Sequence, residues 1–266
     1  MRDYLVFVRA GRNSLHTKFL AQDPLRNWDC CVSWYREPAP EAADAAEFHE
    51  TEGDNKFEAF ASFFRKTATS HPYRYYLVVD DDIDFAAGDI SRLFSLCSRH
   101  QTFLCQPALR WGTHSNHSVT LWNPACVVRR TTFVEVMSPC FSRRAVEELE
   151  HVFSLTRSTW GIDYAWSSLL AGQNKLTIID AVRVAHTKPV DLRGGAFYRK
   201  LKRQGINPTQ EYYAVTRRFP AFGAWCTLPR GHVFAGGLPA WLGRSLTMLL
   251  EWAKERVHRR LTSARK

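Results

Sequence analysis

A run of five bulky residues, Tyr75-Tyr-Leu-Val-Val79, ends at three consecutive aspartates, Asp80-Asp-Asp82. Short apolar runs bounded by polar residues are typical of strands that are buried on both faces, as in parallel sheets. In open α/β sheets, ligands bind at the carboxyl ends of the strands. We therefore expect a fold built around a sheet that carries clustered carboxylates at this edge.

Strands and helices are predicted to alternate through the first 105 residues. Residues 4–8 and 30–34 have the composition of buried strands. Phe57, Phe60 and Phe64 recur at helical spacing, which predicts an amphipathic helix over residues 56–66. This alternation favours an α/β fold with a mostly parallel central sheet.

The rest of the chain is predicted as shorter elements. They are a helix from Asp89 to about residue 97, strands over 102–105, 119–121 and 127–129, a helix capped by Ser142, a helix over 163–170, and strands over 176–179 and 182–185. After residue 194 the chain is rich in Gly, Pro and Arg, and it becomes helix-like from Pro239. We expect a domain over residues 1–200 and a basic extension over 201–266 that packs on it.

Composition limits the class of protein. The 266 residues include 36 Lys and Arg against 26 Asp and Glu, a net charge of +10, and 45% apolar residues, which excludes wholesale disorder. No stretch reaches the roughly 18 apolar residues of a spanning helix, and the apolar opening is too short for a signal peptide, so a cytoplasmic location is expected. Seven cysteines without zinc-ligand spacing predict reduced, mostly buried thiols.

The aspartate run is a candidate metal site. Neighbouring carboxylates repel one another unless a cation neutralises them, and Mg²⁺ and Mn²⁺ prefer oxygen ligands. Asp80 and Asp82 after a buried strand therefore suggest a metal that holds the phosphates of a substrate. His186, after the last predicted strand, is a candidate to complete the metal shell. The alternatives are an acidic solvated turn and a structural histidine.

Two further carboxylates stand out. Asp163 in Trp160-Gly161-Ile-Asp163 is either a helix N-cap or a general base beside an acceptor hydroxyl. Glu135 lies in an apolar stretch, where an unpaired charge is costly, so it either faces solvent or contacts a sugar or an arginine. Candidates for contacts to a diphosphate or base are Arg9, Asn13, Lys56, Lys188 and Arg193, although each taken singly has the character of an ordinary surface residue.

Four blocks of the chain together resemble a known family. They are residues 75–82, Gln106-Pro-Ala-Leu109, residues 133–143 and Trp160-Gly-Ile-Asp163. In this order they are similar to the domain-of-unknown-function family 707, whose plant members are labelled lysine-ketoglutarate-reductase trans-splicing-related proteins. That family is placed with the GT-A glycosyltransferases. The resemblance covers residues 4–200 and implies a GT-A-like, Rossmann-like three-layer α/β/α sandwich, with a helical or irregular C-terminal extension.

The resemblance also implies an activity and roles. It implies transfer of a sugar from a nucleotide-diphosphate sugar to a hydroxyl of a glycan or lipid-linked acceptor, with Mn²⁺ or Mg²⁺ on Asp80, Asp82 and His186. Asp163 would be the base of an inverting reaction, and Asp81 would lie beside the donor without touching the metal. Acceptor contacts are assigned to Glu135, Trp160 and Gly161. The compact size and basic tail favour bacterial polysaccharide biosynthesis.

Two other functions suit parts of the sequence. Clustered carboxylates with a metal also serve phosphoryl transferases and nucleases. A basic nucleic-acid-binding protein would explain the net charge and the aromatic residues, but it leaves the aspartate run unexplained, so no nucleic-acid partner is expected.

The C-terminal tail has two interpretations. From Arg244 onward it has seven Lys or Arg against two Glu, with leucines and a tryptophan between them. Such a segment either docks on the domain with a basic outer face, or contacts an anionic membrane as a peripheral helix at the inner face of the cell membrane.

Overall fold

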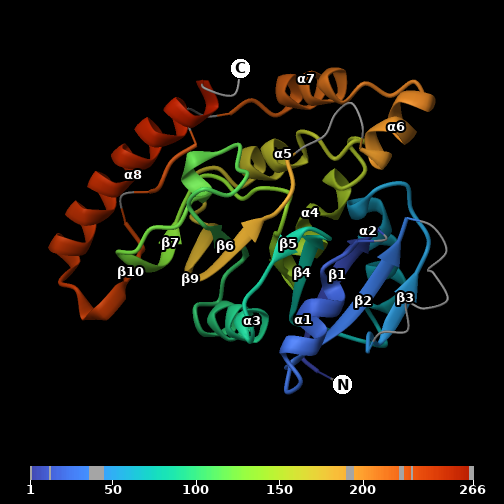
Figure 1. Cartoon of the computed structure of the whole chain (residues 1–266), viewed down its shortest axis with the longest axis horizontal. Coiled ribbons are helices and arrows are strands. Elements are labelled where there is room, and N and C mark those ends of the chain that lie inside the picture. Colours follow the sequence, from blue (N-terminus) through green and yellow to red (C-terminus); the bar gives the residue numbers. More distant parts are fainter. Residues whose placement is uncertain are drawn as a thin grey trace.

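A mixed sheet of ten strands runs through the part of the chain that the computed structural model describes, residues 2–11, 13–35, 45–189, 195–221, 225–228 and 230–263. The strands are β1 (Tyr4–Ala10), β2 (Trp28–Trp34), β3 (Phe48–Glu50), β4 (Tyr75–Asp80), β5 (Ile83–Asp84), β6 (Leu104–Leu109), β7 (Cys126–Arg130), β8 (Cys140–Ser142), β9 (Leu176–His186) and β10 (Val233–Phe234). Their order is β10-β7-β9-β6-β8-β4-β1-β2-β3, and β5 pairs with β9 (Figure 1).

The long strands of the sheet share one direction. β3, β2, β1 and β4 pair in parallel, and β6 pairs in parallel with β9. The short strand β8 lies antiparallel between β4 and β6, so β6 and β9 keep the direction of β4. β7 opposes β9, and β10 opposes β7. The predicted parallel character therefore holds for the long strands, with β7 and β8 running against them.

Helices cover both faces of the sheet (Figure 1). They are α1 (His16–Gln22), α2 (Lys56–Thr67), α3 (Asp89–Arg99), α4 (Arg143–Leu149), α5 (Ile162–Leu169), α6 (Ala196–Arg203), α7 (Pro208–Arg218) and α8 (Ala240–Ser263), with 3₁₀ turns η1 (Ser118–Thr120), η2 (Glu150–Val152) and η3 (Ala235–Gly237).

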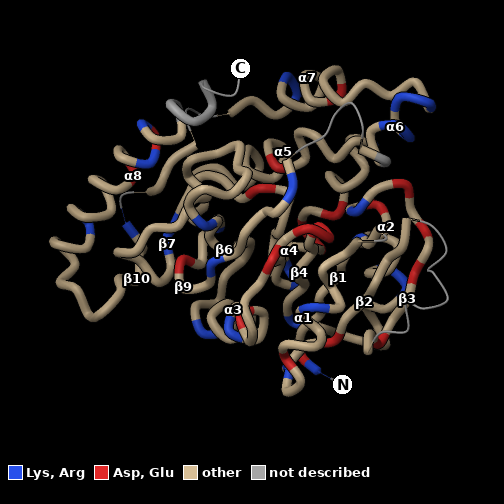
Figure 2. Tube along the Cα trace, viewed as in Figure 1, with Lys and Arg blue, Asp and Glu red and all other residues tan. Residues whose placement is uncertain are grey.

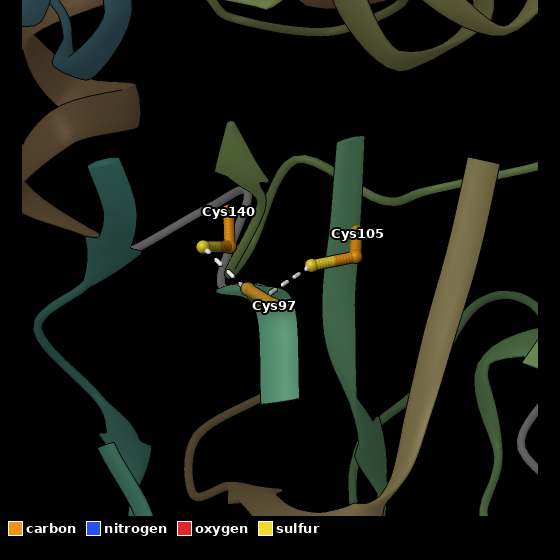
Figure 3. A group of neighbouring side chains, drawn as sticks. All are labelled: Cys97, Cys105 and Cys140. Atoms are coloured by element: carbon orange, nitrogen blue, oxygen red, sulfur yellow. Dashed lines mark hydrogen bonds between the residues drawn. The ribbon is translucent and has the colours of Figure 1, made fainter. Parts of the chain in front are cut away.

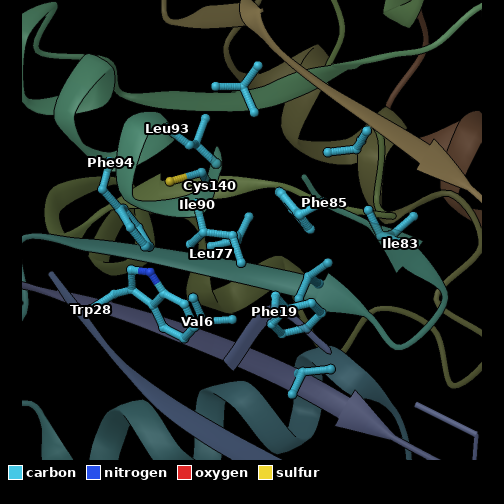
Figure 4. Close-up of a cluster of buried hydrophobic side chains, with 14 of the residues drawn as sticks. Val6, Phe19, Trp28, Leu77, Ile83, Phe85, Ile90, Leu93, Phe94 and Cys140 are labelled. Atoms are coloured by element: carbon cyan, nitrogen blue, oxygen red, sulfur yellow. The ribbon is translucent and has the colours of Figure 1, made fainter. Parts of the chain in front are cut away.

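Two hydrophobic cores lie on opposite sides of the sheet, because side chains alternate along each strand. Val6 and Val8 of β1 pack in one core with residues of α1 and α3, and Figure 4 shows this core. Leu5 and Phe7 pack in the other core with residues of α2, α4 and α5. This arrangement is the predicted three-layer α/β/α sandwich.

A helix lies at each predicted position, but the cap expected at α3 differs. Phe57, Phe60 and Phe64 of α2 are buried as predicted, and the side chain of Ser142 caps α4 by accepting from the amide of Ala145. At α3 the N-cap is Gly88 with a φ of +73°, and Asp89 lies inside the first turn. The expectation that Asp89 caps α3 was therefore wrong.

Two strand predictions were also wrong. Residues 118–120 form η1, in which Thr120 Oγ1 donates to the His117 carbonyl, rather than a strand. The two strands expected between residues 176 and 185 are one strand, β9, with a bulge where its pairing with β6 jumps from Ile179 to Arg183. Pro107 of β6 lies at this jump, and proline has no N–H to continue a ladder.

The C-terminal part of the chain packs against the rest. The expected domain boundary at residue 200 falls within α6, α7 lies against α5, and α8 lies against η1. Lys254 of α8 is fully buried and its Nζ donates to the Leu121 carbonyl at 2.6 Å. No helix in the described ranges is long and apolar enough to cross a membrane.

Six of the seven cysteines are buried, and Cys226 is exposed. The sulfurs of Cys97, Cys105 and Cys140 lie within 4.8 Å of one another (Figure 3). Burial raises the pKa of the Cys97 and Cys140 thiols, which keeps them neutral. Hydrogen bonds with Cys140 and Cys97 outweigh burial at Cys105 and lower the pKa of its thiol, so the three sulfurs form one hydrogen-bonded group inside the core.

Candidate active site

The acidic turn between β4 and β5 lies at the carboxyl end of the parallel strands (Figure 2). Asp80 is the last residue of β4. The next residue, Asp81, accepts a hydrogen bond through Oδ2 from the amide of Gly11, at 2.7 Å. A Cβ at Gly11 would lie 3.1 Å from this oxygen, so glycine permits the close approach. Asp81 is thus held against the loop that follows β1.

His186 lies beside Asp82 because of the register between β5 and β9. Ile83 pairs with His186, and the amide of Thr187 donates to the Asp82 carbonyl at 3.0 Å. His186 Nε2 is 3.4 Å from Asp82 Oδ2, and His186 Nδ1 is 3.2 Å from the His114 carbonyl. Although burial disfavours both charges, this contact lowers the pKa of Asp82 and raises that of His186. The structure thus brings together two of the three predicted metal ligands.

The third predicted ligand, Asp80, has an internal partner. Lys56, the first residue of α2, is buried, and its Nζ donates to Asp80 Oδ1 at 2.6 Å and to the Val136 carbonyl at 2.6 Å. Burial raises the pKa of Asp80, and the charge of Lys56 opposes that rise. In the structure protein partners hold this ammonium, and the contact of Lys56 with a donor stays a prediction.

Arg9 is also enclosed. Its guanidinium donates to Ser33 Oγ at 2.6 Å and to the Gly53 carbonyl at 2.6 Å, and it lies over the ring of Tyr35. Arg9 is buried, and its contact with a donor likewise stays a prediction.

The other predicted donor contacts lie at the surface or outside the described ranges. Asn13 and Lys188 are exposed. The charge of Lys188 favours the ionised forms of Asp81 and Asp82, so this lysine lies on the side of the acidic turn. Arg193 lies outside the described residues.

Asp163 lies in the first turn of α5. Gly161, with a φ of +86°, occupies the N-cap, so the alternative that Asp163 caps the helix was wrong. Asp163 Oδ1 accepts from the amide of Tyr164 at 3.0 Å, and the side chain is only 6% exposed. Burial raises the pKa of Asp163 to about 7, and hydrogen bonds from backbone amides oppose that rise. This carboxyl can therefore exchange a proton near neutral pH.

Glu135 is the neighbour of Asp163 and not a solvent-facing strand residue. It lies in an irregular segment, is 2% exposed, and its amide donates to Gln106 Oε1 at 2.6 Å. Burial and the charge of Asp163 raise the pKa of Glu135 to about 8, while a hydrogen bond with Asn116 opposes them. Glu135 and Asp163 thus form an interacting pair of buried carboxyls, and the pKa of each is raised well above its ordinary value.

Trp160 leads to a residue that the sequence did not single out. Its indole Nε1 donates to the hydroxyl of Tyr198 on α6, at 3.1 Å. Burial raises the pKa of Tyr198, and the charge of Asp80 adds to that rise, so α6 comes close to the acidic turn. α6 is held there by an ion pair between Lys200 Nζ and Asp54 Oδ1, at 2.9 Å. The sequence around Tyr198 is basic and has no recognisable motif, so it did not predict that this tyrosine lies near the acidic turn.

The residues at this edge fit a divalent cation in their chemistry. Two carboxylates and an imidazole are ligands that Mn²⁺ accepts, and Mg²⁺ accepts the oxygens. In the described part of the chain, the one trio of candidate ligand atoms that all lie within 4.8 Å of one another is the cysteine group. Asp80, Asp82 and His186 are neighbours at this edge of the sheet, but their candidate ligand atoms do not all lie within 4.8 Å of one another.

Comparison with solved structures assigns the architecture. A crystal structure of GalNAc-T7 with UDP, GalNAc and Mn²⁺ matches with a TM-score of 0.52 and 14% identity, over 81% of this chain and 47% of that chain. The chain adopts a GT-A-type fold. It spans about half the length of the GalNAc-T7 structure that it matches. The sequence matches no protein-family model and no curated protein.

Two further solved structures have TM-scores below 0.5. A Desulfovibrio desulfuricans G20 protein, provisionally described as a nucleotide-diphospho-sugar transferase, matches at 0.42 and 12% identity, over 82% of this chain and 99% of that one. A197 from STIV matches at 0.43 and 10% identity, over 71% of this chain and 86% of that one. The fold assignment rests on the first comparison.

Proposed function

We propose that the protein is a metal-dependent glycosyltransferase that moves a sugar from a nucleotide-diphosphate sugar to a hydroxyl group. The observation that carries this proposal is the buried Asp163 carboxyl, with its pKa near neutrality, beside the acidic turn at the carboxyl edge of a GT-A-type sheet. The likeness to GalNAc-T7, solved with UDP, GalNAc and Mn²⁺, supports the donor class. The same proposal includes membership of family 707 and a glycan or lipid-linked acceptor. It also places the protein in bacterial polysaccharide synthesis, at the cytoplasmic face of the membrane.

Asp80, Asp82 and His186 would hold the divalent cation. When bound there, the ion supplies Lewis-acid neutralisation of the charge that develops on the diphosphate. Lys188, whose charge already acts on Asp81 and Asp82, adds positive potential on the same side. Lys56 positions Asp80 from beneath the turn.

Asp163 accepts the proton of the acceptor hydroxyl. The acceptor oxygen forms a bond to the anomeric carbon as the bond from that carbon to the diphosphate breaks, which inverts the configuration. A base with a pKa of about 7 is deprotonated in a large fraction of molecules at neutral pH and still accepts a proton effectively. Glu135, with a pKa of about 8, is mainly protonated at neutral pH and can donate a hydrogen bond to the acceptor.

Thermal unfolding with nucleoside diphosphates and nucleotide sugars, with and without Mn²⁺, tests the donor site. A ligand at a hundredfold excess over its Kd stabilises the folded state by about 2.7 kcal/mol. We expect a Mn²⁺-dependent rise in Tm with one nucleotide class, and a loss of the Mn²⁺-dependent part in Asp82→Asn.

A transfer assay then tests the reaction. Asp163→Asn should keep the rise in Tm and lose transfer of the sugar. No rise with any nucleotide, or hydrolysis of phosphodiesters without sugar transfer, would contradict the proposal, and the second result would favour a phosphoryl transferase or nuclease.

A further inference from the structure

Helix α8 is fixed to the molecule by one face. Thr247 and Lys254 on this face are buried, and Lys254 Nζ donates to the Leu121 carbonyl and to Glu251 Oε1, each at 2.6 Å. At Gly243 an added Cβ would lie 2.4 Å from the ring of Phe234, so only glycine permits this close packing. Hydrogen-bonded polar groups and tight packing thus hold α8 at the β10 side of the molecule, where Figure 1 shows it lying along the outer edge.

The opposite face of α8 carries large apolar side chains in solvent. Trp241 is 66% exposed, Met248 62%, Leu249 66% and Trp252 58%. Positions 241, 248 and 252 recur at helical spacing and form one stripe, with Leu249 beside it. We call these four residues the outer face of α8. A contiguous exposed apolar surface of this kind marks an interaction site.

Charged residues near the outer face favour an anionic partner. Arg244, Arg256 and one acidic residue, Glu255, are exposed on the same helix, which leaves a net positive charge, and the guanidinium of Arg256 lies 4.5 Å from the centre of the Trp252 ring. Figure 2 marks the Lys and Arg positions along α8. Tryptophan with arginine and aliphatic residues is the composition of helices that lie in the headgroup region of a bilayer. A second copy of this chain would bring two arginines and one glutamate to the contact from each side, and this like net charge opposes self-association.

We propose that the outer face of α8 seats the protein on a membrane surface that is rich in anionic headgroups. In this arrangement Trp241, Met248, Leu249 and Trp252 enter the headgroup region, and Arg244 and Arg256 contact lipid phosphates. The helix lies flat, with its buried face still on the protein.

The end of α8 also reaches toward the candidate active site. His258 Nε2 lies 3.2 Å from the Asn116 carbonyl, and the Asn116 side chain lowers the pKa of Glu135, the neighbour of Asp163, so it lies near that carboxyl. A membrane under α8 therefore favours an acceptor that is itself anchored in a lipid. This last step rests on the proposed function, whereas the docking of α8 does not.

Co-sedimentation of the full chain with vesicles tests the docking. We expect the protein to bind vesicles of phosphatidylcholine mixed with phosphatidylglycerol roughly tenfold more tightly than vesicles of phosphatidylcholine alone. Trp241→Ser combined with Trp252→Ser should weaken binding to the anionic vesicles by about tenfold or more. Arg244→Gln combined with Arg256→Gln should remove most of the preference for anionic lipid. The matched control is Leu25→Ser combined with Tyr213→Ser, which removes exposed apolar groups elsewhere and should bind as the unmodified chain does.

The proposal fails if the unmodified chain does not bind anionic vesicles, or if the tryptophan variant binds as well as the control variant. Sedimentation velocity of the protein without vesicles measures its oligomeric state and so tests whether the outer face of α8 binds a second copy instead. A dimer that the tryptophan variant converts to a monomer, without vesicle binding by the unmodified chain, would overturn the proposal in favour of a second copy as the partner. Because none of these measurements uses the transfer reaction, failure of the docking is distinguishable from failure of the proposed function.

Discussion

The Nζ atom of Lys56 lies 2.6 Å from Oδ1 of Asp80, and the lysine is only 3% exposed. The same ammonium group donates to the carbonyl of Val136. The ammonium of Lys56 therefore joins three segments that are distant in sequence. They are the start of α2, the end of β4 and the segment beside Glu135. This contact fixes the orientation of the acidic turn and connects it to the segment next to Asp163.

Lys56→Met should lower the free energy of unfolding by about 2 kcal/mol, because it leaves buried carbonyl oxygens and the Asp80 carboxylate without their donor. Urea unfolding measures this change. Lys66→Met on the same helix is the control: Lys66 pairs with Glu52 in solvent, and its loss should change stability by less than about 0.5 kcal/mol. Equal effects of the two substitutions would show that the buried pair has no special role.

Asp163→Asn should reduce sugar transfer by about 10²- to 10⁴-fold, because the amide cannot accept the proton. In the unmodified protein, kcat/KM should rise with pH through an apparent pKa near 7, and the variant's residual rate should lack that rise. Asp89→Asn, which changes a first-turn carboxylate on α3, should keep the full rate. A normal pH profile in Asp163→Asn would remove Asp163 from the role of base.

Stability should fall as pH rises through the range in which Asp163 and Glu135 ionise. Their folded pKa values, about 7 and about 8, lie above the ordinary values of 3.8 and 4.5. Between these values the folded state binds more protons than the unfolded state, so the free energy of unfolding decreases with pH. We expect each of the two carboxyls to contribute on the order of 2–4 kcal/mol to this decrease between pH 5 and pH 8.

Urea unfolding in the presence of a chelator isolates this contribution. The double variant Asp163→Asn with Glu135→Gln should lose it and be the more stable protein at pH 8. Parallel stability–pH curves for the variant and the unmodified chain would contradict the prediction.

Gly161→Ala should harm both stability and activity. The backbone φ of +86° disfavours alanine, and the new Cβ would lie 3.1 Å from Val215 Cβ on α7. Gly172→Ala is a close control, because its φ is +73° and no atom lies within 4 Å of the new Cβ. Both substitutions should lose about 1 kcal/mol from backbone strain. Only Gly161→Ala should also shift the start of α5 and reduce transfer, and equal loss of activity in the two variants would argue against this positioning role.

The local pattern of apolar residues was sufficient to predict individual strands and helices, because their formation depends on residues that are close in sequence. The apolar run before Asp80 is a buried strand, and the phenylalanine spacing of α2 gives a buried face. Pattern failed at Asp89 and Asp163, where glycine in the left-handed region starts the helix instead of a side-chain cap. It also missed the bulge in β9, because the break is defined by the pairing with β6, where Pro107 lies opposite it on a different strand.

For the candidate site, residue types were predictable and pairings were not. Asp82 and His186 lie together because of a strand register that no local pattern contains. Lys56 and Arg9 have the character of surface cations in the sequence, but the fold encloses both of them. The proximity of Glu135 to Asp163 likewise depends on how α5 packs against residues 133–139, where Trp166 Nε1 donates to the Val134 carbonyl at 2.8 Å.

The candidate metal site can form during synthesis only after β9 has been made, because β5 pairs with the end of β9. Thr187 and Asp82 are separated by 105 residues along the chain. A nascent chain therefore carries its acidic turn through the synthesis of most of the sheet before the histidine and its strand arrive. A chain that stops before β9 would keep the aspartates but lack His186. The candidate metal site therefore forms only in a chain in which the last long strand has paired.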